Sequence, residues 1–318
     1  MQRYLPVTVL LSAFLFGLFG VVSANDAPPV PSAGSSQEAV VSLVNDLAKP
    51  CLKAPTKIRQ GEAFEVLVSA PSEAKHSPTP QALTLDGKTF PLYAHASDSY
   101  SALLSIPVDA KPGGHTLRVV FKGPATTAVK TPELSQVLQV LPGGYARQNI
   151  GVSSSIGGLQ PEPGELAAVQ ALKVMRTAGK RWQLPLSAPT PDCLNSPFGN
   201  LRFHNGVFTG NYHKGIDLRS PAGRPVVAPA DATVAMARKW QLHGGTVGLD
   251  HGQGLTSIYI HLSQILVSPG QQVKRGQIIG KVGSTGFATG PHLHWGVFAA
   301  GEPVNPFWMT SGVRACGR

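Results

Sequence analysis

Glycine and proline interrupt this 318-residue chain so often that long helices have little room. It holds 35 glycines and 28 prolines, together about a fifth of the residues. This share is too low for collagen and too high for a helical bundle, and it favours short β-strands joined by turns. Hydrophobic residues make up 42% of the chain and charged residues 14%, so it can build packed cores. We therefore expect a mainly β protein.

The first 24 residues have the build of a secretory signal peptide. Arg3 supplies positive charge, the run from Val7 to Val22 is apolar, and small residues place the cleavage site after Ala24. The apolar run is shorter than the roughly 20 residues that a membrane-spanning helix needs. The alternative is an uncleaved membrane anchor. We expect an exported protein, periplasmic or secreted, with no stable membrane insertion after cleavage.

The rest of the chain divides into four segments by composition. Residues 25–50 are typical of a flexible tether. Residues 51–142 contain short strands bounded by turns and predict a small antiparallel β-sandwich, an accessory domain. Residues 143–184 predict a linker with one amphipathic helix. Residues 185–318 predict a second domain, which contains most of the histidines.

Local patterns within these segments give more specific expectations. In the sandwich we expect strands over residues 62–69, 83–85, 100–106 and 116–121, and a turn at Pro112-Gly113-Gly114. In the linker, apolar residues at helical spacing predict a helix of about four turns that closes at Gly179 and serves packing. These apolar residues are Leu166, Val169, Leu172 and Met175.

The chain has three cysteines, Cys51, Cys193 and Cys316. An exported protein can form disulfides, and an odd number of cysteines leaves one thiol over. Cys193 and Cys316 bracket the last third of the chain, so a bridge between them would join the two ends of the second domain. The sequence does not fix the pairing, but we favour this one, with Cys51 left free.

The chain is basic, with a formal net charge of +10. After residue 184 it has eleven Lys or Arg residues and five Asp or Glu residues. A basic surface favours an anionic partner such as nucleic acid, lipid headgroups or an acidic wall polymer. We expect no nucleic-acid binding, because no aromatic stacking platform or recognisable motif accompanies the charge.

Seven of the ten histidines lie from His204 onward, and three patterns stand out among them. They are His213-Lys214-Gly215-Ile216-Asp217, Tyr259-Ile260-His261-Leu262-Ser263 and Gly290-Pro291-His292-Leu293-His294-Trp295. Residues two apart in a strand share a face, so His292 and His294 would present both rings on one side. Such a pair could bind one metal together, or one could bind while the other acts on a substrate. A lone His-x-His could also be two surface histidines.

The first pattern adds a carboxylate to these histidines. Gly215 disfavours a regular helix, and a turn followed by a strand from Ile216 can aim His213 and Asp217 at one point. Together with His294 they would fill three corners of a tetrahedron around zinc. The fourth corner would be open for water, as in catalytic zinc sites.

Other residues of this region have weaker signals. His243 and His251 are expected to be structural, and His204 is placed in a loop without an assigned role. Gly283-Ser284-Thr285-Gly286 lacks the P-loop lysine and precedes a strand, not a helix. We expect it to form a turn or a substrate-lining rim.

The stretch from about Ser196 to Phe307 resembles the lysostaphin/LytM-type zinc metallopeptidases, whose members cut peptide bonds in bacterial peptidoglycan. The shared segments are, in order, Phe198-Gly199, HKGIDL, RPVVAPADATV, LDHGQG, IYIHLS, VKRGQIIGKVGSTG and TGPHLHW. The resemblance implies that His213, Asp217 and His294 bind one zinc ion and that His261 and His292 form the catalytic pair. It also implies a compact antiparallel β-sheet with a groove across it.

The implied activity is that of a zinc-dependent metalloendopeptidase acting on cross-links or stem peptides of peptidoglycan through a metal-activated water. Which of His261 and His292 is the general base stays open. Some relatives place a tyrosine that stabilises the transition state upstream of the first ligand, and the candidates here are Tyr212 and His204. The basic second domain suits the carboxylates of peptidoglycan. We expect a monomer.

Two other functions fit parts of the sequence. A non-catalytic wall-binding amidase activator typically lacks zinc ligands, whereas every ligand position is filled here. A secreted protease acting on glycine-rich proteins is compatible with the charge. The sequence leaves open which peptide bond is cut, whether the first domain inhibits the groove, and whether the target is the cell's own wall or another cell.

Overall fold

The computed structural model describes residues 50–69, 79–96, 99–122 and 133–316. The predicted signal peptide and nearly all of the predicted tether lie outside these residues. From Leu47 onward the chain clusters as one compact unit, so the division into two domains at residue 184 stays a prediction. No helix in the described ranges is both long enough and apolar enough to cross a membrane.

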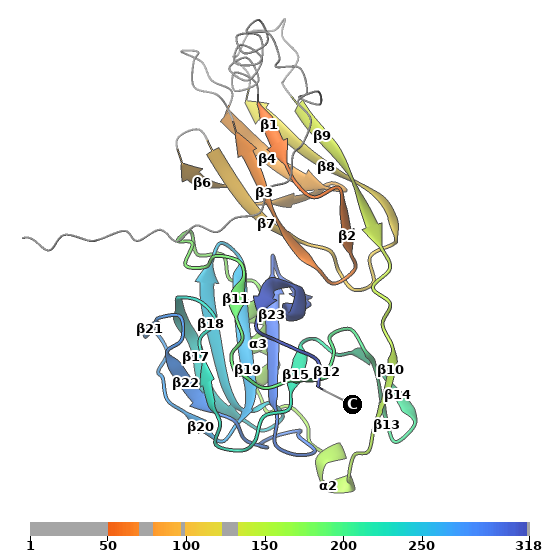
Figure 1. Cartoon of the computed structure of the whole chain (residues 1–318), viewed down its shortest axis with the longest axis vertical. Helices are drawn as coiled ribbons and strands as arrows, with labels where there is room; N and C mark the ends of the chain where they lie inside the picture. The colour runs from red at the N-terminus through yellow and green to blue at the C-terminus, as the bar shows by residue number, and fades with distance from the viewer. Residues whose placement is uncertain (1–49, 70–78, 97–98, 123–132, 317–318) are drawn as a thin grey trace, which may run out of the picture. The chain divides into compact units, whose positions relative to one another are not determined.

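The first part of the described chain is a β-sandwich of two sheets (Figure 1). Between them lies a core that includes the fully buried Val66, Leu83, Leu104 and Leu117. One sheet has the order β1-β3-β7-β6, made of β1 (Cys51–Lys53), β3 (Ala63–Ser69), β7 (Ser99–Ser105) and β6 (Tyr93–Ala96). The other has the order β2-β9-β8-β4-β5, made of β2 (Lys57–Arg59), β9 (Glu133–Leu141), β8 (Gly113–Lys122), β4 (Thr79–Leu85) and β5 (Lys88–Phe90).

The predicted sandwich is therefore present, with two differences from expectation. β2 pairs with β9 in parallel, so the sandwich is not wholly antiparallel. Gly113 and Gly114, expected in a turn, begin β8 and pair with Val140 and Gln139 of β9. A partner strand far along the chain thus extends β8 through residues whose local preference is for a turn.

The second part of the chain is built on an eight-stranded sheet in which every strand pair is antiparallel, as predicted. Its order is β12-β15-β23-β19-β18-β17-β21, and β24 also pairs with β23. The strands are β12 (Leu194–Ser196), β15 (Ile216–Leu218), β23 (Leu293–Ala299), β19 (Leu255–Leu262), β18 (Gly244–Gly252), β17 (Ala232–Trp240), β21 (Gln272–Val273) and β24 (Glu302–Val304).

The two faces of this sheet have different partners. Along β23, Leu293, Trp295 and Val297 are fully buried in the main core. Successive side chains of a strand point to opposite faces, so His294 and Phe298 lie on the other face. There Phe298 belongs to a separate small core that includes Leu172 of the helix α3 (Glu165–Lys173). The helix and His294 therefore share one face of the sheet.

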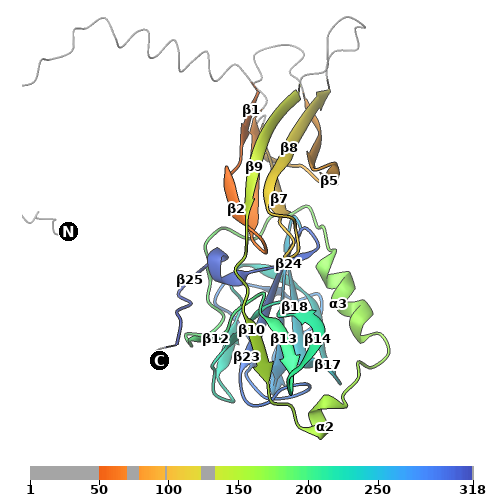
Figure 2. The ribbon, with the colours of Figure 1, turned by 90° about the vertical axis from the view of Figure 1, so that its right-hand side faces the viewer.

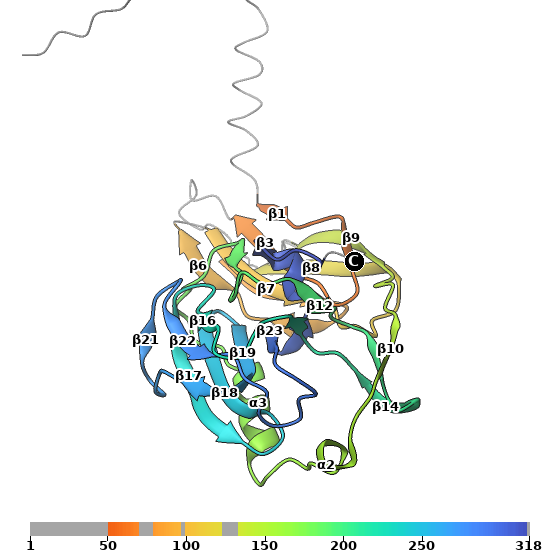
Figure 3. The same ribbon diagram turned by 60° about the horizontal axis from the view of Figure 1, so that its bottom comes forward.

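Shorter elements complete this part. A sheet β10-β13-β14 lies beside the large sheet, on the side of β12 (Figures 2 and 3). It consists of β10 (Arg147–Ile150), β13 (Leu201–His204) and β14 (Val207–Tyr212). The remaining elements are β16 (Pro225–Val227), β22 (Ile278–Lys281), β20 (Gln264–Ile265), β11 (Leu186–Ser187), β25 (Thr310–Ser311), the short helix α2 (Ser154–Gly157) and the 3₁₀ helix η1 (Pro306–Met309).

The predicted linker helix is present as α3, but it is shorter than four turns. It ends at Lys173, before Met175. The residues that follow form backbone hydrogen bonds with the end of β18: Gln253 N–H donates to the Thr177 carbonyl and Arg181 N–H to the His251 carbonyl. The chain must leave the helix to make these contacts.

The favoured disulfide is present. Cys193 and Cys316 are bonded, with their Cα atoms 4.9 Å apart, and Cys51 is free. The bridge links the segment before β12 to the end of the described chain, and so joins the two ends of the predicted second domain.

Replacing both Cys193 and Cys316 by serine should lower the free energy of unfolding, because the bridge spans 123 positions. By the chain-entropy model a loop of this length contributes about 4–5 kcal/mol. Urea unfolding of the parent and the double variant measures the loss, and Cys51→Ser is the matched control. An unchanged unfolding midpoint in the double variant would contradict the prediction.

Candidate metal centre

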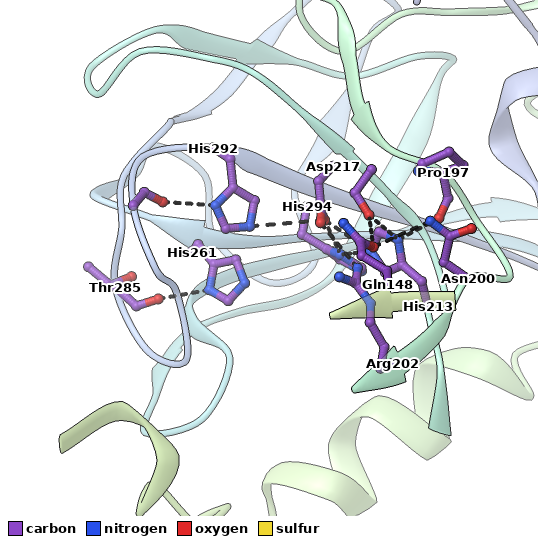
Figure 4. Close-up of polar contacts among 12 residues, drawn as sticks. Gln148, Pro197, Asn200, Arg202, His213, Asp217, His261, Thr285, His292 and His294 are labelled. Carbon is purple, nitrogen blue, oxygen red and sulfur yellow. Dashed lines mark hydrogen bonds and ion pairs between the residues drawn. The ribbon is translucent and has the colours of Figure 1, made fainter. Parts of the chain in front are cut away.

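Three side chains from the sequence patterns meet on the large sheet (Figure 4). Asp217 lies in the middle of β15 and is paired in register with His294 on β23, while His213 lies between β14 and β15. Asp217 Oδ1 is 2.8 Å from His294 Nδ1 and 3.0 Å from His213 Nε2. The two imidazole nitrogens are 3.0 Å apart. The structure therefore brings all three predicted metal-binding groups to one point.

The Phe198-Gly199 turn fixes the backbone of His213. His213 N–H donates to the Asn200 carbonyl, and Gly199 N–H donates to the His213 carbonyl, both at 2.9 Å. Phe198 is buried and packs edge-on against Tyr145, with ring centroids 6.1 Å apart. Gly199 has a φ of +80°, and a Cβ there would lie 2.1 Å from the Tyr145 ring. Only glycine fits this position, which explains the Phe-Gly pair locally.

The chemistry of the three donors fits a divalent cation. His213 Nδ1 is 2.8 Å from the Pro197 carbonyl, which can only accept, so Nδ1 carries the proton and the lone pair of Nε2 is free to bind an ion. A circle through the three donor atoms has a radius of about 1.7 Å. This is shorter than the roughly 2.0–2.2 Å of zinc bonds to nitrogen and oxygen. One ion could therefore contact all three atoms without moving them.

Electrostatics keep these donors in the forms that metal binding requires. Burial lowers the pKa of His294 to about 4, so its ring is neutral at physiological pH. Burial alone would raise the pKa of Asp217, but His213 and His294 hold it well below its usual range. Metal ligands must be neutral imidazoles and ionised carboxylates. Both groups are in that state at neutral pH.

The two predicted catalytic histidines lie side by side next to the metal-binding trio. The ring centroids of His261 and His292 are 4.8 Å apart, and His292 Nε2 is 4.0 Å from Asp217 Oδ1. Each Nδ1 donates to a carbonyl at 2.8 Å, His261 to Thr285 and His292 to Gly290. Each Nε2 therefore presents a lone pair. Burial, together with the nearby His292 and His294, lowers the pKa of His261 to about 3.

The backbone of His261 has a φ of +65°, a left-handed conformation that residues other than glycine rarely adopt. The Gly283–Gly286 segment holds it there. A Cβ at Gly283 would lie 2.7 Å from the His261 carbonyl oxygen, so glycine permits the close approach. Thr285 accepts the His261 ring proton on its carbonyl and donates from Oγ1 to the Leu262 carbonyl. The glycine-rich turn thus orients His261.

The histidines and Asp217 line a cleft of about 290 Å³. Arg202, which sequence reasoning missed, also lines it and donates from Nη2 to Asp217 Oδ2 at 3.2 Å. Since Asp217 Oδ1 faces the two imidazoles, Arg202 fixes the second oxygen and the tilt of the carboxylate.

Arg202 was missed because the region around His204 was expected to be a loop, and this was wrong. His204 ends β13, and Asn205-Gly206 forms a two-residue turn into β14 with φ values of +48° and +86°. Asn-Gly between β-rich runs is the strongest short hairpin signal, so the hairpin was detectable. The His204 ring stacks on Phe287, with centroids 5.2 Å apart, and lines the cleft.

The segment predicted as a linker also contributes to the site. β10 pairs in parallel with β13. The Gln148 side-chain oxygen accepts from Ser196 Oγ at 2.8 Å and from Asn200 Nδ2 at 3.3 Å. Ser196 and Asn200 flank the turn that holds His213. No local sequence pattern predicts this contact, because it depends on the pairing of two strands that lie about 50 residues apart in the chain.

The structure separates the two candidates for the transition-state-stabilising role. Tyr212 packs against Phe198 with ring centroids 6.1 Å apart, and burial raises its pKa to about 12. It is not among the residues that line the cleft, whereas His204 is. His204 is therefore the candidate that fits the geometry.

The two histidines expected to be structural have such contacts. His243 Nδ1 is 2.6 Å from the buried carboxylate of Glu165 on α3. His251 is fully buried between the Asp231 carbonyl and Ser257 Oγ, at 3.0 and 2.8 Å.

An antiparallel sheet that carries a His/Asp/His cluster in an open cleft has the arrangement of a metallopeptidase. Residues 211–306 match the sequence pattern of peptidase family M23. A crystal structure of a candidate M23 peptidase from Pseudomonas aeruginosa has a TM-score of 0.55 and 30% identity to this chain. The structural alignment covers 79% of this chain and 93% of the Pseudomonas aeruginosa chain. The chain belongs to peptidase family M23.

Curated relatives match about a third of this chain. The peptidoglycan DD-endopeptidase ShyA of Vibrio cholerae is 42% identical over 112 residues, which is 35% of this chain and 26% of ShyA. The DD-carboxypeptidase/endopeptidase Mpg of Neisseria meningitidis is 42% identical over 113 residues, which is 36% of this chain and 26% of Mpg. The match thus spans about a quarter of the length of these relatives.

Purified protein should bind about one zinc ion per chain, and His294→Ala should reduce this to well below 0.1, because the site loses one of three ligands. Elemental analysis after dialysis measures the content. His204→Ala is the matched control: it removes an imidazole from the same cleft but none of the three donors. Full zinc content in His294→Ala would contradict the assignment.

Folding should weaken in mild acid because of His251. Its pKa falls from about 6.5 in the unfolded chain to about 4 in the fold, where burial is the main cause. Between these values the unfolded chain binds more protons, so stability rises with pH through this window and is complete above it. The shift corresponds to about 3 kcal/mol. An NMR titration in which the His251 ring protonates above pH 5.5 in the folded protein would contradict this.

Proposed function

We propose that this protein is a zinc-dependent endopeptidase that hydrolyses peptide cross-links or stem peptides of bacterial peptidoglycan. The observation that carries the proposal is the convergence of three metal-compatible donors beside two further histidines in one open cleft. A purely structural cluster would have no need for two further imidazoles with exposed lone pairs. The name of the relative ShyA, a peptidoglycan DD-endopeptidase, supports peptidoglycan as the substrate.

His213, Asp217 and His294 would hold the ion. Zinc bound there would polarise a substrate carbonyl and make water more acidic. Arg202 keeps the Asp217 carboxylate oriented, and the Pro197 carbonyl keeps the lone pair of His213 aimed at the centre. These contacts fix the donors before a ligand arrives, which reduces the reorganisation that binding would otherwise require.

The proton transfers fall to His261 and His292. Each has its Nδ1 proton committed to a carbonyl, so Nε2 is the nitrogen that can accept a proton from an attacking water and return it to the leaving amine. In its protonated form the same ring would stabilise the negative charge that develops on the substrate oxygen. Either histidine can serve as the base on this geometry.

Several further features belong to the proposal. Hydrolysis of peptidoglycan requires export, in agreement with the leader expected over residues 1–24, to the periplasm or beyond the cell. The basic charge after residue 184 would hold the protein near an acidic polymer through long-range attraction that weakens with salt. We propose that the protein acts as a monomer.

His261→Ala should keep zinc but lose about 10²–10⁴-fold in turnover, because it removes a proton-transfer group and no metal donor. Release of muropeptides from purified sacculi, followed by mass spectrometry with and without a chelator, measures the activity and identifies the bond cut. The conservative control is Tyr212→Phe, which removes a hydroxyl outside the cleft. Digestion by His261→Ala at the parent rate would refute the assigned role.

A further inference from the structure

A second hollow adjoins the reaction centre on the other side of His294. It has a volume of about 270 Å³ and lies between α3 and the strands β19 and β23. His294 lines both this hollow and the cleft described above. The two spaces therefore meet at one of the metal-binding side chains. A substrate that extends from the cleft past His294 would reach this hollow.

Part of the wall of this hollow is apolar. Phe298 and Ile258 lie on the same face of the large sheet as His294, and Leu166 and Val169 of α3 face them. These surfaces suit the aliphatic part of a side chain, because contact with them removes apolar area from water.

Two lysines, Lys173 and Lys214, also line the hollow. Lys173 Nζ, at the end of α3, lies 5.8 Å from the centre of the Phe298 ring. Lys214 Nζ, beside the metal-binding His213, lies 5.9 Å from the centre of the Tyr212 ring. Both distances are at the outer limit of a cation–π contact. These rings therefore compensate the two charges only weakly.

No carboxylate balances these lysines within the described residues. Neither forms an ion pair there, and no Asp or Glu lines the hollow. The nearby Glu165 is buried and committed to other partners, since it accepts from the backbone N–H groups of Leu242 and His243 and from the His243 ring. The hollow is thus positively charged and open to an anion from outside the chain.

We propose that this hollow is a subsite for a substrate carboxylate, bound by Lys173 and Lys214. The inference rests on the proposed peptidase function and specifies its substrate class. A residue with an aliphatic stem and a free carboxylate, next to the scissile bond, gains both the apolar walls and the two ammonium groups. A glycine bridge or an amidated residue gains neither charge contact.

The test compares one substrate in two charge states. Cross-linked muropeptide dimers are purified from sacculi, and half are converted to primary amides with carbodiimide and ammonia. The parent enzyme should cleave the carboxylate form with a KM at least tenfold lower than that for the amide. Lys173→Met combined with Lys214→Met should raise the KM for the carboxylate form about tenfold, with kcat within about twofold, and abolish the preference.

Matched variants and a binding arm separate the alternatives. Lys173→Arg combined with Lys214→Arg should retain most of the preference, and Lys239→Met, a lysine of β17 outside the hollow, should retain all of it. Calorimetry with zinc-free protein should show at least tenfold tighter binding of the carboxylate dimers, lost in the double methionine variant. Equal binding of both dimers, or an unchanged preference in that variant, overturns the subsite. If the parent cleaves neither dimer, the proposed function fails, and calorimetry still decides the subsite.

Discussion

The pairing of β15 with β23 is the constraint on which the rest of the site depends. Asp217 and His294 face each other across this pair, while Leu218 and Leu293, one position along, face each other in the core. A slip of one residue would exchange the two sets, placing a carboxylate in an apolar core and leucines in the cleft. The packing of the sheet and the geometry of the site are therefore fixed by the same register.

The site brings together polar groups whose burial costs free energy unless they have hydrogen-bond partners. A carboxylate and four imidazoles are largely buried there, and such groups require partners. The chain supplies them from separate elements: the Pro197 carbonyl, Arg202 on β13, and the carbonyls of Thr285 and Gly290. Each of these contacts also fixes which nitrogen carries a proton or which oxygen is free. The same contacts therefore satisfy the buried polar groups and prepare the site for a cation.

The sequence predicted the parts of this arrangement that depend on short-range residue patterns. The alternation around Leu293 and the turn-strand pattern at Gly215 led to the trio that the structure contains. The family resemblance implied the antiparallel sheet, and the disulfide was favoured because Cys193 and Cys316 bracket the last third of the chain. The Asn205-Gly206 hairpin was also written locally and was overlooked. The parallel pairing of β10 with β13 was not, because it joins a segment that reads as a linker to a strand about 50 residues later. Arg202 could be assigned only once that hairpin was in place.

The residues at the candidate metal site and the residues around it come from different parts of the chain. The three candidate metal ligands and both further histidines lie within residues 211–306, the part that matches the family pattern. Arg202, Gln148 and the whole of α3 lie before it, yet they flank the centre on both sides. The chemistry common to a family depends on the residues at the reaction centre, whereas recognition of a particular substrate depends on the residues around it. On the proposed function, the segment between the sandwich and the large sheet would set the substrate specificity of this chain, with Lys173 at the end of α3 as its most direct contact with a substrate.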